Sequence, residues 1–154
     1  MEWNRYTVKL STRSRYGLRL MFELALNFKK GTVFLKDIAE RQALSEKYLS
    51  KLIIPLRAAK LVTSARGAHG GYSLSRPPET ITAREIVEVL EGELGPVECL
   101  KNASACDRSE FCPTQELWRD LAKAMAKVLD SHTLQSLVNK YDANKPQGAW
   151  NYNI

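Results

Sequence analysis

Residues 44–74, LSEKYLSKLIIPLRAAKLVTSARGAHGGYSL, contain a helix pattern followed by a hairpin pattern. Ser45 is a residue type that caps helix N-termini, and Glu46 suits the first turn, where the helix dipole favours a negative charge. The apolar residues share one helical face: Leu49, Leu52, Ile53 and Leu56. The other face largely holds Lys47, Ser50, Lys51 and Ile54. This pattern predicts a helix with a buried face and a polar, basic outer face.

The second half of the stretch predicts a β-hairpin. Pro55 lacks a backbone N–H, so we expect the helix to kink or end there, with its exposed reading surface before that residue. Residues 61–75 then favour two short strands joined by a glycine-rich loop. Arg66 and His69 would lie at the tip of this hairpin.

The preceding residues predict two further helices. From Ser11 or Thr12, either of which suits a helix cap, apolar residues follow helical spacing as far as Lys29. Residues 35–41 form a shorter helix, and residues 42–44 form a tight turn. Helix, short turn, helix and hairpin are typical of a winged helix-turn-helix, so we expect a mainly α domain with a two-stranded β-wing over residues 8–80.

The second half of the chain predicts an appended oligomerisation unit. Thr82 would cap a connecting helix within residues 81–98, with Ile86, Val89 and Leu90 buried before Gly92. A cysteine loop follows at residues 99–112, then dimerisation helices at 113–141, with Pro113 in the first turn, and a tail at 142–154. One stripe of the long helix is apolar: Leu117, Leu121, Ala124, Met125, Val128 and Leu129. A small winged domain is too short to cover this stripe, so the same helix of a second subunit is the expected partner, with packing inside one subunit as the alternative.

Charge divides the chain into two parts. Its 154 residues carry a net charge of +6, but the first 80 hold 15 Lys and Arg against 6 Asp and Glu, and the remainder hold 8 against 11. A basic first half suits a polyanion such as double-stranded DNA. We find no apolar run long enough for a membrane span or signal peptide and no nucleophile with a nearby base, so we expect a cytoplasmic protein that does not enter membranes and is not an enzyme.

The three cysteines, Cys99, Cys106 and Cys112, have the spacing C-x6-C-x5-C. Three thiols cannot all pair within one chain, and the reducing cytosol disfavours structural disulfides. Thiolates are the soft ligands that iron–sulfur clusters and zinc prefer, and the surrounding residues are too polar for a buried core. The pattern predicts a metal site, with a structural zinc ion as the alternative to an iron–sulfur cluster.

Taken in order, four segments resemble the IscR-like family of bacterial winged-helix regulators: LSTRSRYGLRLMFELAL, residues 44–74, CDRSEFC and ELWRDL. The resemblance implies a homodimer that places helix 45–54 in the major groove and the wing in a minor groove. It assigns Ser45, Tyr48, Ser50 and Lys51 to the recognition helix, and Arg66 to a narrow minor groove of negative potential. Contacts to phosphates are expected from Arg13, Lys47 and Lys51, and either phosphate contact or solvent exposure from His69.

The same resemblance implies that the cysteines hold a [2Fe-2S] cluster with a fourth, non-cysteine ligand; nitric-oxide-sensing relatives hold a [4Fe-4S] cluster. Gln115 stands where the family often has a histidine ligand, and Arg15 stands where other relatives have a carboxylate. The fourth ligand is therefore open among Gln115, Glu98, Asp107, Glu110, water or a small thiol.

The tail, GAWNYNI at 148–154, resembles the ends of cysteine-metabolism repressors in the CymR-like branch of this family. Those relatives pair with O-acetylserine sulfhydrylase and lack the three cysteines. The second interpretation is therefore a cysteine-metabolism repressor that binds this enzyme through its terminal Ile154. A tail that folds back onto its own dimer is the simpler alternative.

Overall fold

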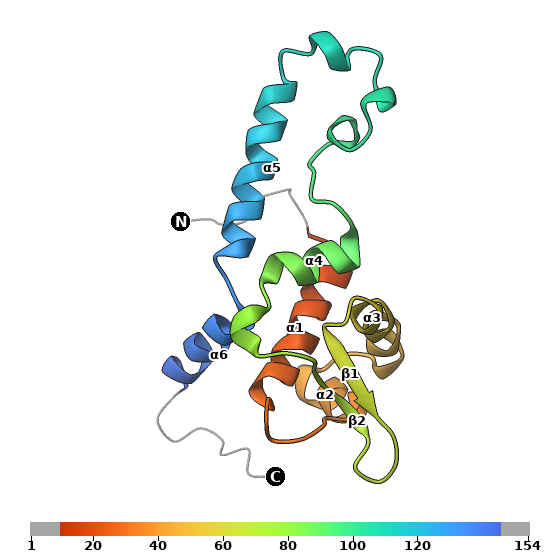
Figure 1. The fold of residues 1–154 in the computed structure, drawn as a ribbon, viewed down its shortest axis with the longest axis vertical. Helices are drawn as coiled ribbons and strands as arrows, with labels where there is room; N and C mark the ends of the chain where they lie inside the picture. The colour runs from red at the N-terminus through yellow and green to blue at the C-terminus, as the bar shows by residue number, and fades with distance from the viewer. Residues whose placement is uncertain (1–9, 146–154) are drawn as a thin grey trace.

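The computed structural model describes residues 10–145 and has a mainly helical architecture with one small sheet (Figure 1). Its main elements are α1 (Thr12–Leu26), α2 (Leu35–Gln42), α3 (Glu46–Ala58), β1 (Val62–Ala65), β2 (Gly71–Leu74), α4 (Ala83–Glu91), α5 (Gln115–Asp130) and α6 (Leu134–Ala143). The antiparallel pair β1–β2 follows α3 directly. The predicted winged helix-turn-helix with a long helix after it is confirmed.

Three helices begin at the predicted caps. The Ser11 hydroxyl oxygen accepts hydrogen bonds from the backbone N–H groups of Arg13 and Ser14, and Ser45 accepts one from the N–H of Tyr48. Thr82 forms a capping box with Glu85, in which each side chain accepts from the other residue's backbone N–H. These bonds satisfy N–H groups that a helix N-terminus otherwise leaves without partners, so local sequence fixes where α1, α3 and α4 begin.

Pro55 was predicted to kink or end the third helix. It does not end the helix, because α3 continues to Ala58. Leu56, beyond the proline, is fully buried, and its burial offsets the lost hydrogen bond. The end is fixed instead at Lys60, which has a φ of 59°. There the N–H of Leu61 donates to the Leu56 carbonyl at 3.0 Å and the N–H of Lys60 donates to Arg57 at 2.9 Å, a Schellman motif.

The loop end of the wing is anchored to the segment between α1 and α2. Val33 and Tyr72 exchange two backbone hydrogen bonds of 2.9 and 2.8 Å, which adds a third chain segment beside β2. The Thr32 hydroxyl donates to the His69 carbonyl oxygen at 2.9 Å. A free two-stranded hairpin is only marginally stable in water, so these bonds hold the wing in a defined orientation.

The core lies between α1 and the helices around it. α1 packs against α4, α6 and α3, and Leu20, Met21 and Leu24 are almost wholly buried. On α4 the structure corrects one residue of the predicted buried face, because Val87 is fully buried whereas Val89 is only half-buried. The buried face of α4, which consists of Ala83, Ile86, Val87 and Leu90, is therefore rotated around the helix relative to the predicted stripe.

The segment between α4 and α5 projects from one end of the molecule, opposite the wing tip (Figure 1). It contains three single 3₁₀ turns, at Glu98–Leu100, Ala103–Ala105 and Ser109–Phe111. α5 begins at Gln115, so Pro113 precedes the helix and does not lie in its first turn as predicted. α6 packs against α1 of the same chain and buries Leu134 completely.

Candidate functional site

The outer face of α3 presents the predicted basic and polar side chains to solvent. Ser45, Lys47, Ser50 and Lys51 are all exposed, and Arg57 extends the row beyond Pro55. The Ser50 hydroxyl donates to the Glu46 carbonyl at 2.9 Å, which leaves its oxygen lone pairs for an outside donor. This face has the shape and charge that fit a DNA major groove.

Tyr48, also predicted on this face, is half-buried and contacts α1. Its ring meets the ring of Tyr16 edge to face, with centroids 5.8 Å apart. The guanidinium groups of Arg15 and Arg19 lie 5.9 and 5.6 Å from the centre of the Tyr16 ring. Sequence reasoning did not assign Tyr16 and Arg19 to the site; the spacing of Arg15 and Arg19, one helical turn apart, was the available signal.

A buried polar network fixes the turn before α3. The Glu23 carboxylate on α1 accepts a hydrogen bond from the Gln42 amide at 2.5 Å and lies 3.5 Å from the Arg41 guanidinium. The Arg19 Nε donates to the Gln42 side-chain oxygen at 2.7 Å. A buried carboxylate is costly unless it is paired, so the network ties the end of α2 and the turn before α3 to α1.

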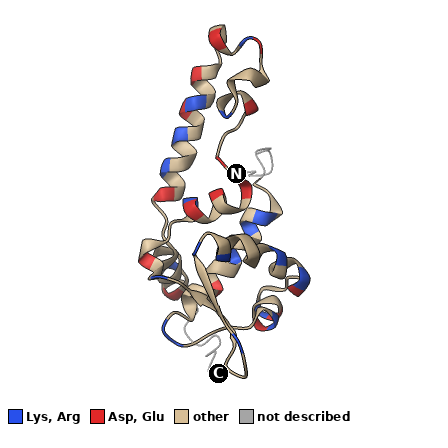
Figure 2. Ribbon diagram, turned by 45° about the vertical axis from the view of Figure 1, so that its right-hand side comes forward, with Lys and Arg blue, Asp and Glu red and all other residues tan. Residues whose placement is uncertain are grey.

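The wing carries Arg66 and His69 in its exposed loop, as predicted. Arg13 is exposed in the first turn of α1, where its charge lies close enough to lower the pKa of Glu91. Figure 2 shows the contrast in charge between the basic helix-turn-helix and wing and the acidic residues of α4. Lys47, Lys51 and Arg66 therefore lie on the part of the domain that suits a polyanion.

The three cysteines lie on the segment between α4 and α5 and are free and half-buried. Cys99 lies in the first 3₁₀ turn, Cys106 follows the second and Cys112 follows the third. The structure does not gather them: across residues 10–145, no group of three His, Cys, Asp or Glu side chains is close enough to hold a metal ion.

The thiol of Cys112 lies beside polar groups at the start of α5. A hydrogen bond with the Thr114 hydroxyl, 3.2 Å from the sulfur, lowers the pKa of Cys112, with smaller contributions from backbone N–H groups and the Arg108 charge. Gln115, at the family histidine position, is the first residue of α5, and its side-chain oxygen accepts from Arg119 at 3.3 Å. A lowered thiol pKa favours the thiolate form that binds metals.

The chemistry of this donor set fits an iron–sulfur cluster. Three thiols that form no disulfide lie on one segment that is free of core packing, and one of them is biased toward the thiolate. Holding one centre with all three sulfurs requires the segment to fold more tightly than it does here. Metal binding and ordering of the segment would therefore occur together.

The start of α1 is joined to the end of α4, next to residues 92–114, which carry the three cysteines and are called the cysteine segment below. The Glu91 carboxylate accepts hydrogen bonds from the Ser11 hydroxyl and, at 2.6 Å, from the Ser14 hydroxyl. Burial alone raises the pKa of Glu91, but the bonds from Ser11 and Ser14 and the Arg13 charge outweigh it, and the net pKa is lowered from the usual 4.5. The ionised carboxylate therefore stabilises the junction between α1 and α4.

Glu91→Gln is expected to lower the free energy of unfolding at neutral pH by less than about 1 kcal/mol, because the carboxylate is partly exposed. A carboxylate whose pKa is lowered by folding stabilises the protein at pH values above its pKa in the unfolded chain. This contribution is lost as the pH falls through its pKa in the folded protein. The difference between wild type and variant, measured by urea denaturation, should therefore shrink below about pH 4.5. A difference that is constant from neutral to acid pH would contradict the assignment.

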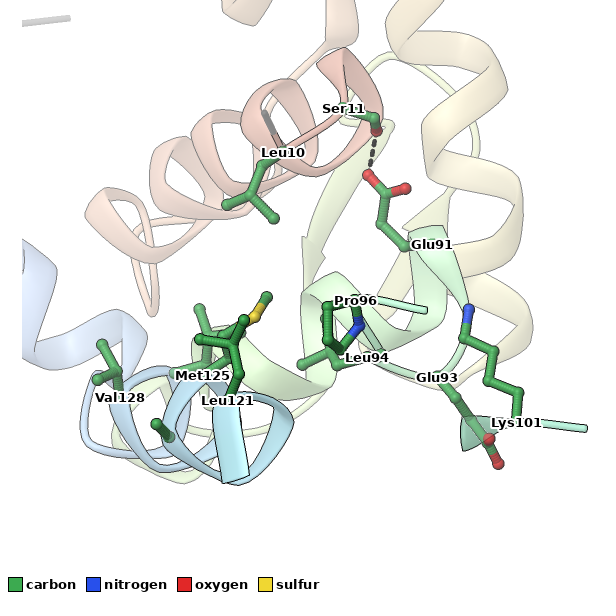
Figure 3. Close-up of a pocket in the computed structure, with 13 residues that line it drawn as sticks. Leu10, Ser11, Glu91, Glu93, Leu94, Pro96, Lys101, Leu121, Met125 and Val128 are labelled. Carbon is green, nitrogen blue, oxygen red and sulfur yellow. Dashed lines mark hydrogen bonds between the residues drawn. The ribbon is translucent and has the colours of Figure 1, made fainter. Parts of the chain in front are cut away.

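An apolar groove of about 760 Å³ separates the start of α1 from α5. Leu10, two residues before α1, and Leu121, Met125 and Val128 of α5 contribute side chains to it (Figure 3). Leu94 and Pro96, from the start of the cysteine segment, close one side. No residue of α5 is buried, and Leu117 and Val128 are 59% and 58% exposed.

A helix-turn-helix, an adjacent anchored wing and a basic outer face on the second helix define a winged-helix DNA-binding regulator of transcription. The Rrf2 family, described as "Iron-dependent Transcriptional regulator", matches residues 10–140. The chain is 45% identical to the HTH-type transcriptional regulator CymR of Bacillus subtilis, over 90% of this chain and 95% of that protein. It is 44% identical to protein rrf2 of Nitratidesulfovibrio vulgaris, over 85% of this chain and 87% of that protein.

Among solved structures, T. potens IscR superimposes with a TM-score of 0.76 at 43% identity, covering 92% of this chain and 95% of that one. The chain belongs to the Rrf2 family of transcriptional regulators. Within residues 10–145, none of the helices has the length and apolar character needed to cross a lipid bilayer.

Proposed function

We propose that this regulator is a homodimeric repressor that senses iron–sulfur cluster status through Cys99, Cys106 and Cys112. The observation that carries the proposal is the placement of three free thiols on one segment outside the core, between the DNA-binding domain and α5. Thiolate sulfur is the donor that iron–sulfur clusters require. The cluster would supply sensitivity to iron, oxygen or nitric oxide, and the protein residues supply its ligands. We favour a [2Fe-2S] cluster, with Gln115 at the position of the fourth ligand.

In the DNA complex, α3 is proposed to enter the major groove and the wing an adjacent minor groove. Ser45, Tyr48, Ser50 and Lys51 would face base edges, and Arg66 the minor groove. The exposed cations Arg13 and Lys47, and also His69, would contact phosphates, which orient the protein without specifying sequence.

The cysteine segment has a short physical route to α3. Its first residues follow Glu91, whose carboxylate is bonded to Ser11 and Ser14 of α1, and α1 packs directly against α3. Ordering of the segment would change the position of α5, which follows it, relative to the DNA-binding domain. In a dimer joined through α5, this change alters the separation of the two recognition helices and hence the DNA sites that both can reach.

The exposed apolar face of α5 supports dimerisation. Leu117, Leu121 and Val128 are exposed in the single chain. A group of large apolar side chains on one helix face is usually covered by another protein surface. A second α5 in two-fold symmetry would bury the same face on both subunits.

Cys112→Ala tests the coupling of the cysteines to DNA binding. In anaerobic material, we expect wild-type protein and the variant to differ about tenfold or more in affinity on at least one operator, because the variant loses a cluster ligand. Ser104→Ala, an exposed hydroxyl change on the same segment, should behave as wild type. Equal affinities of wild type and Cys112→Ala on every operator would contradict the proposal.

The identity to CymR supports the second candidate, a cysteine-metabolism repressor controlled by O-acetylserine sulfhydrylase. The B. subtilis relative, whose structure is solved, is described as "the Global Cysteine Regulator of B. subtilis". The proposed contact, Ile154, lies outside the described residues. Deletion of residues 151–154 should abolish binding to the sulfhydrylase if this candidate is correct and leave an iron-dependent DNA response intact if it is not. A zinc ion on the three cysteines is the remaining alternative.

A further inference from the structure

One side chain on the outer face of α3 differs in chemistry from its neighbours. Ile54 is 65% exposed, although it lies between the polar and basic positions of a helix that is otherwise well packed. Because α3 continues to Ala58, Ile54 lies inside the helix and not at its frayed end. It lies one turn beyond Ser50 and almost one turn before Arg57, in the same exposed row.

The surface around Ile54 is suited to DNA and contains no competing anion. Ile54 lines a groove of about 750 Å³ between the second half of α3 and β1. Its polar lining consists of two cations, Arg57 and Lys60, and three hydroxyl residues, Thr63, Ser64 and Ser75. Such a surface fits a phosphodiester strand beside an apolar group.

We propose that Ile54 is a specificity-determining residue that contacts the C5-methyl group of a thymine in the major groove. The inference rests on the proposed docking of α3. Thymine is the one base that presents an apolar group at the major-groove edge, and Ile54 is the large apolar side chain that α3 exposes. A protein partner at this face would have to bury Lys51, Arg57 and Lys60 without carboxylates from this chain, so the charge favours DNA as the occupant.

The test uses an operator duplex that the wild-type protein enriches from a random-sequence pool, synthesised with thymine or with deoxyuridine in its place. The replacement removes only the methyl groups and keeps base pairing. We expect wild-type protein to bind the uracil duplex about fourfold more weakly per half-site, hence about 15-fold for a dimer. Ile54→Ala should bind the thymine duplex more weakly than wild type. Its ratio of affinities for the thymine and uracil duplexes should be at least fivefold smaller than the wild-type ratio.

The loss of affinity on replacing thymine with uracil is measured for wild type and for Ile54→Ala, and the two losses are compared. The effect of uracil on DNA shape cancels in this comparison, because it is common to both proteins. Thermal unfolding and oligomeric state should be unchanged in Ile54→Ala, since the side chain is exposed. Equal discrimination by wild type and variant would overturn the thymine contact while leaving DNA binding intact. If the protein enriches no duplex at all, even at low salt, the proposed function itself is overturned. A protein partner that competes with DNA at Ile54 would overturn the thymine contact and assign this face to protein binding.

Discussion

Val128→Glu is expected to convert the proposed dimer into a monomer and to weaken operator binding about 100-fold or more. Val128 lies on the apolar face of α5 and is 58% exposed in the single chain, so the change should leave the fold of the subunit intact. In a two-fold dimer, each interface would instead contain two buried carboxylates without partners, and each costs several kcal/mol. Sedimentation velocity and operator titration measure the two effects.

Lys123→Glu is the matched control for Val128→Glu. It also introduces a carboxylate into α5, but on the opposite, polar face, where the Lys123 side chain is 71% exposed. The control should remain a dimer and retain most of its DNA affinity. If both variants remain dimeric with wild-type affinity, the apolar face of α5 is not the subunit interface.

Gly71→Ala is expected to lower the free energy of unfolding by about 3 kcal/mol. Gly71 begins β2 with a φ of +120°, and a Cβ there would lie 2.7 Å from the carbonyl oxygen of Val33. Val33 cannot move away without breaking its two hydrogen bonds to Tyr72, which anchor the wing. The variant should therefore lose stability and, through a displaced Arg66, DNA affinity. Urea denaturation at one fixed protein concentration measures the loss of stability, because a dimer's stability depends on concentration.

Gly67→Ala separates backbone strain from steric overlap. Gly67 also has a positive φ, of +95°, but no atom lies within 4 Å of the position its Cβ would take. We expect a loss of about 1 kcal/mol or less from the strained backbone alone. Equal losses in the two variants would show that the approach of Gly71 to Val33 does not anchor the wing.

Sequence predicted the fold well where local signals and burial agree. Ser11, Ser45 and Thr82 cap their helices as expected, since a cap depends on residues within one turn of it. The end of α3 was mispredicted because Pro55 disfavours a helix locally, whereas the burial of Leu56 depends on the tertiary fold and keeps the helix intact as far as the hydrogen bonds at Lys60. The burial of Val87 in place of Val89 has the same origin, because the face that α4 buries depends on how it lies against α1.

The candidate site was predictable in its residue types but not in its connections. The exposed positions of α3 and the tip of the wing follow from periodicity and turn chemistry. The contacts of Tyr48 with Tyr16, and of Glu23 with Gln42 and Arg41, join residues distant in sequence, and no local pattern indicates them. The sequence placed the three cysteines on one segment, but their spacing gave no information on how close the sulfurs lie.

The visible absorption spectrum of the anaerobically purified full-length chain, with iron, sulfide and zinc analysis on the same sample, tests the cysteine assignment most directly. A red-brown protein with iron and acid-labile sulfide in equal amounts, both lost in a Cys99→Ala, Cys106→Ala, Cys112→Ala triple variant, is the expected result. Colourless wild-type protein that contains only zinc, or no metal at all, would contradict the assignment.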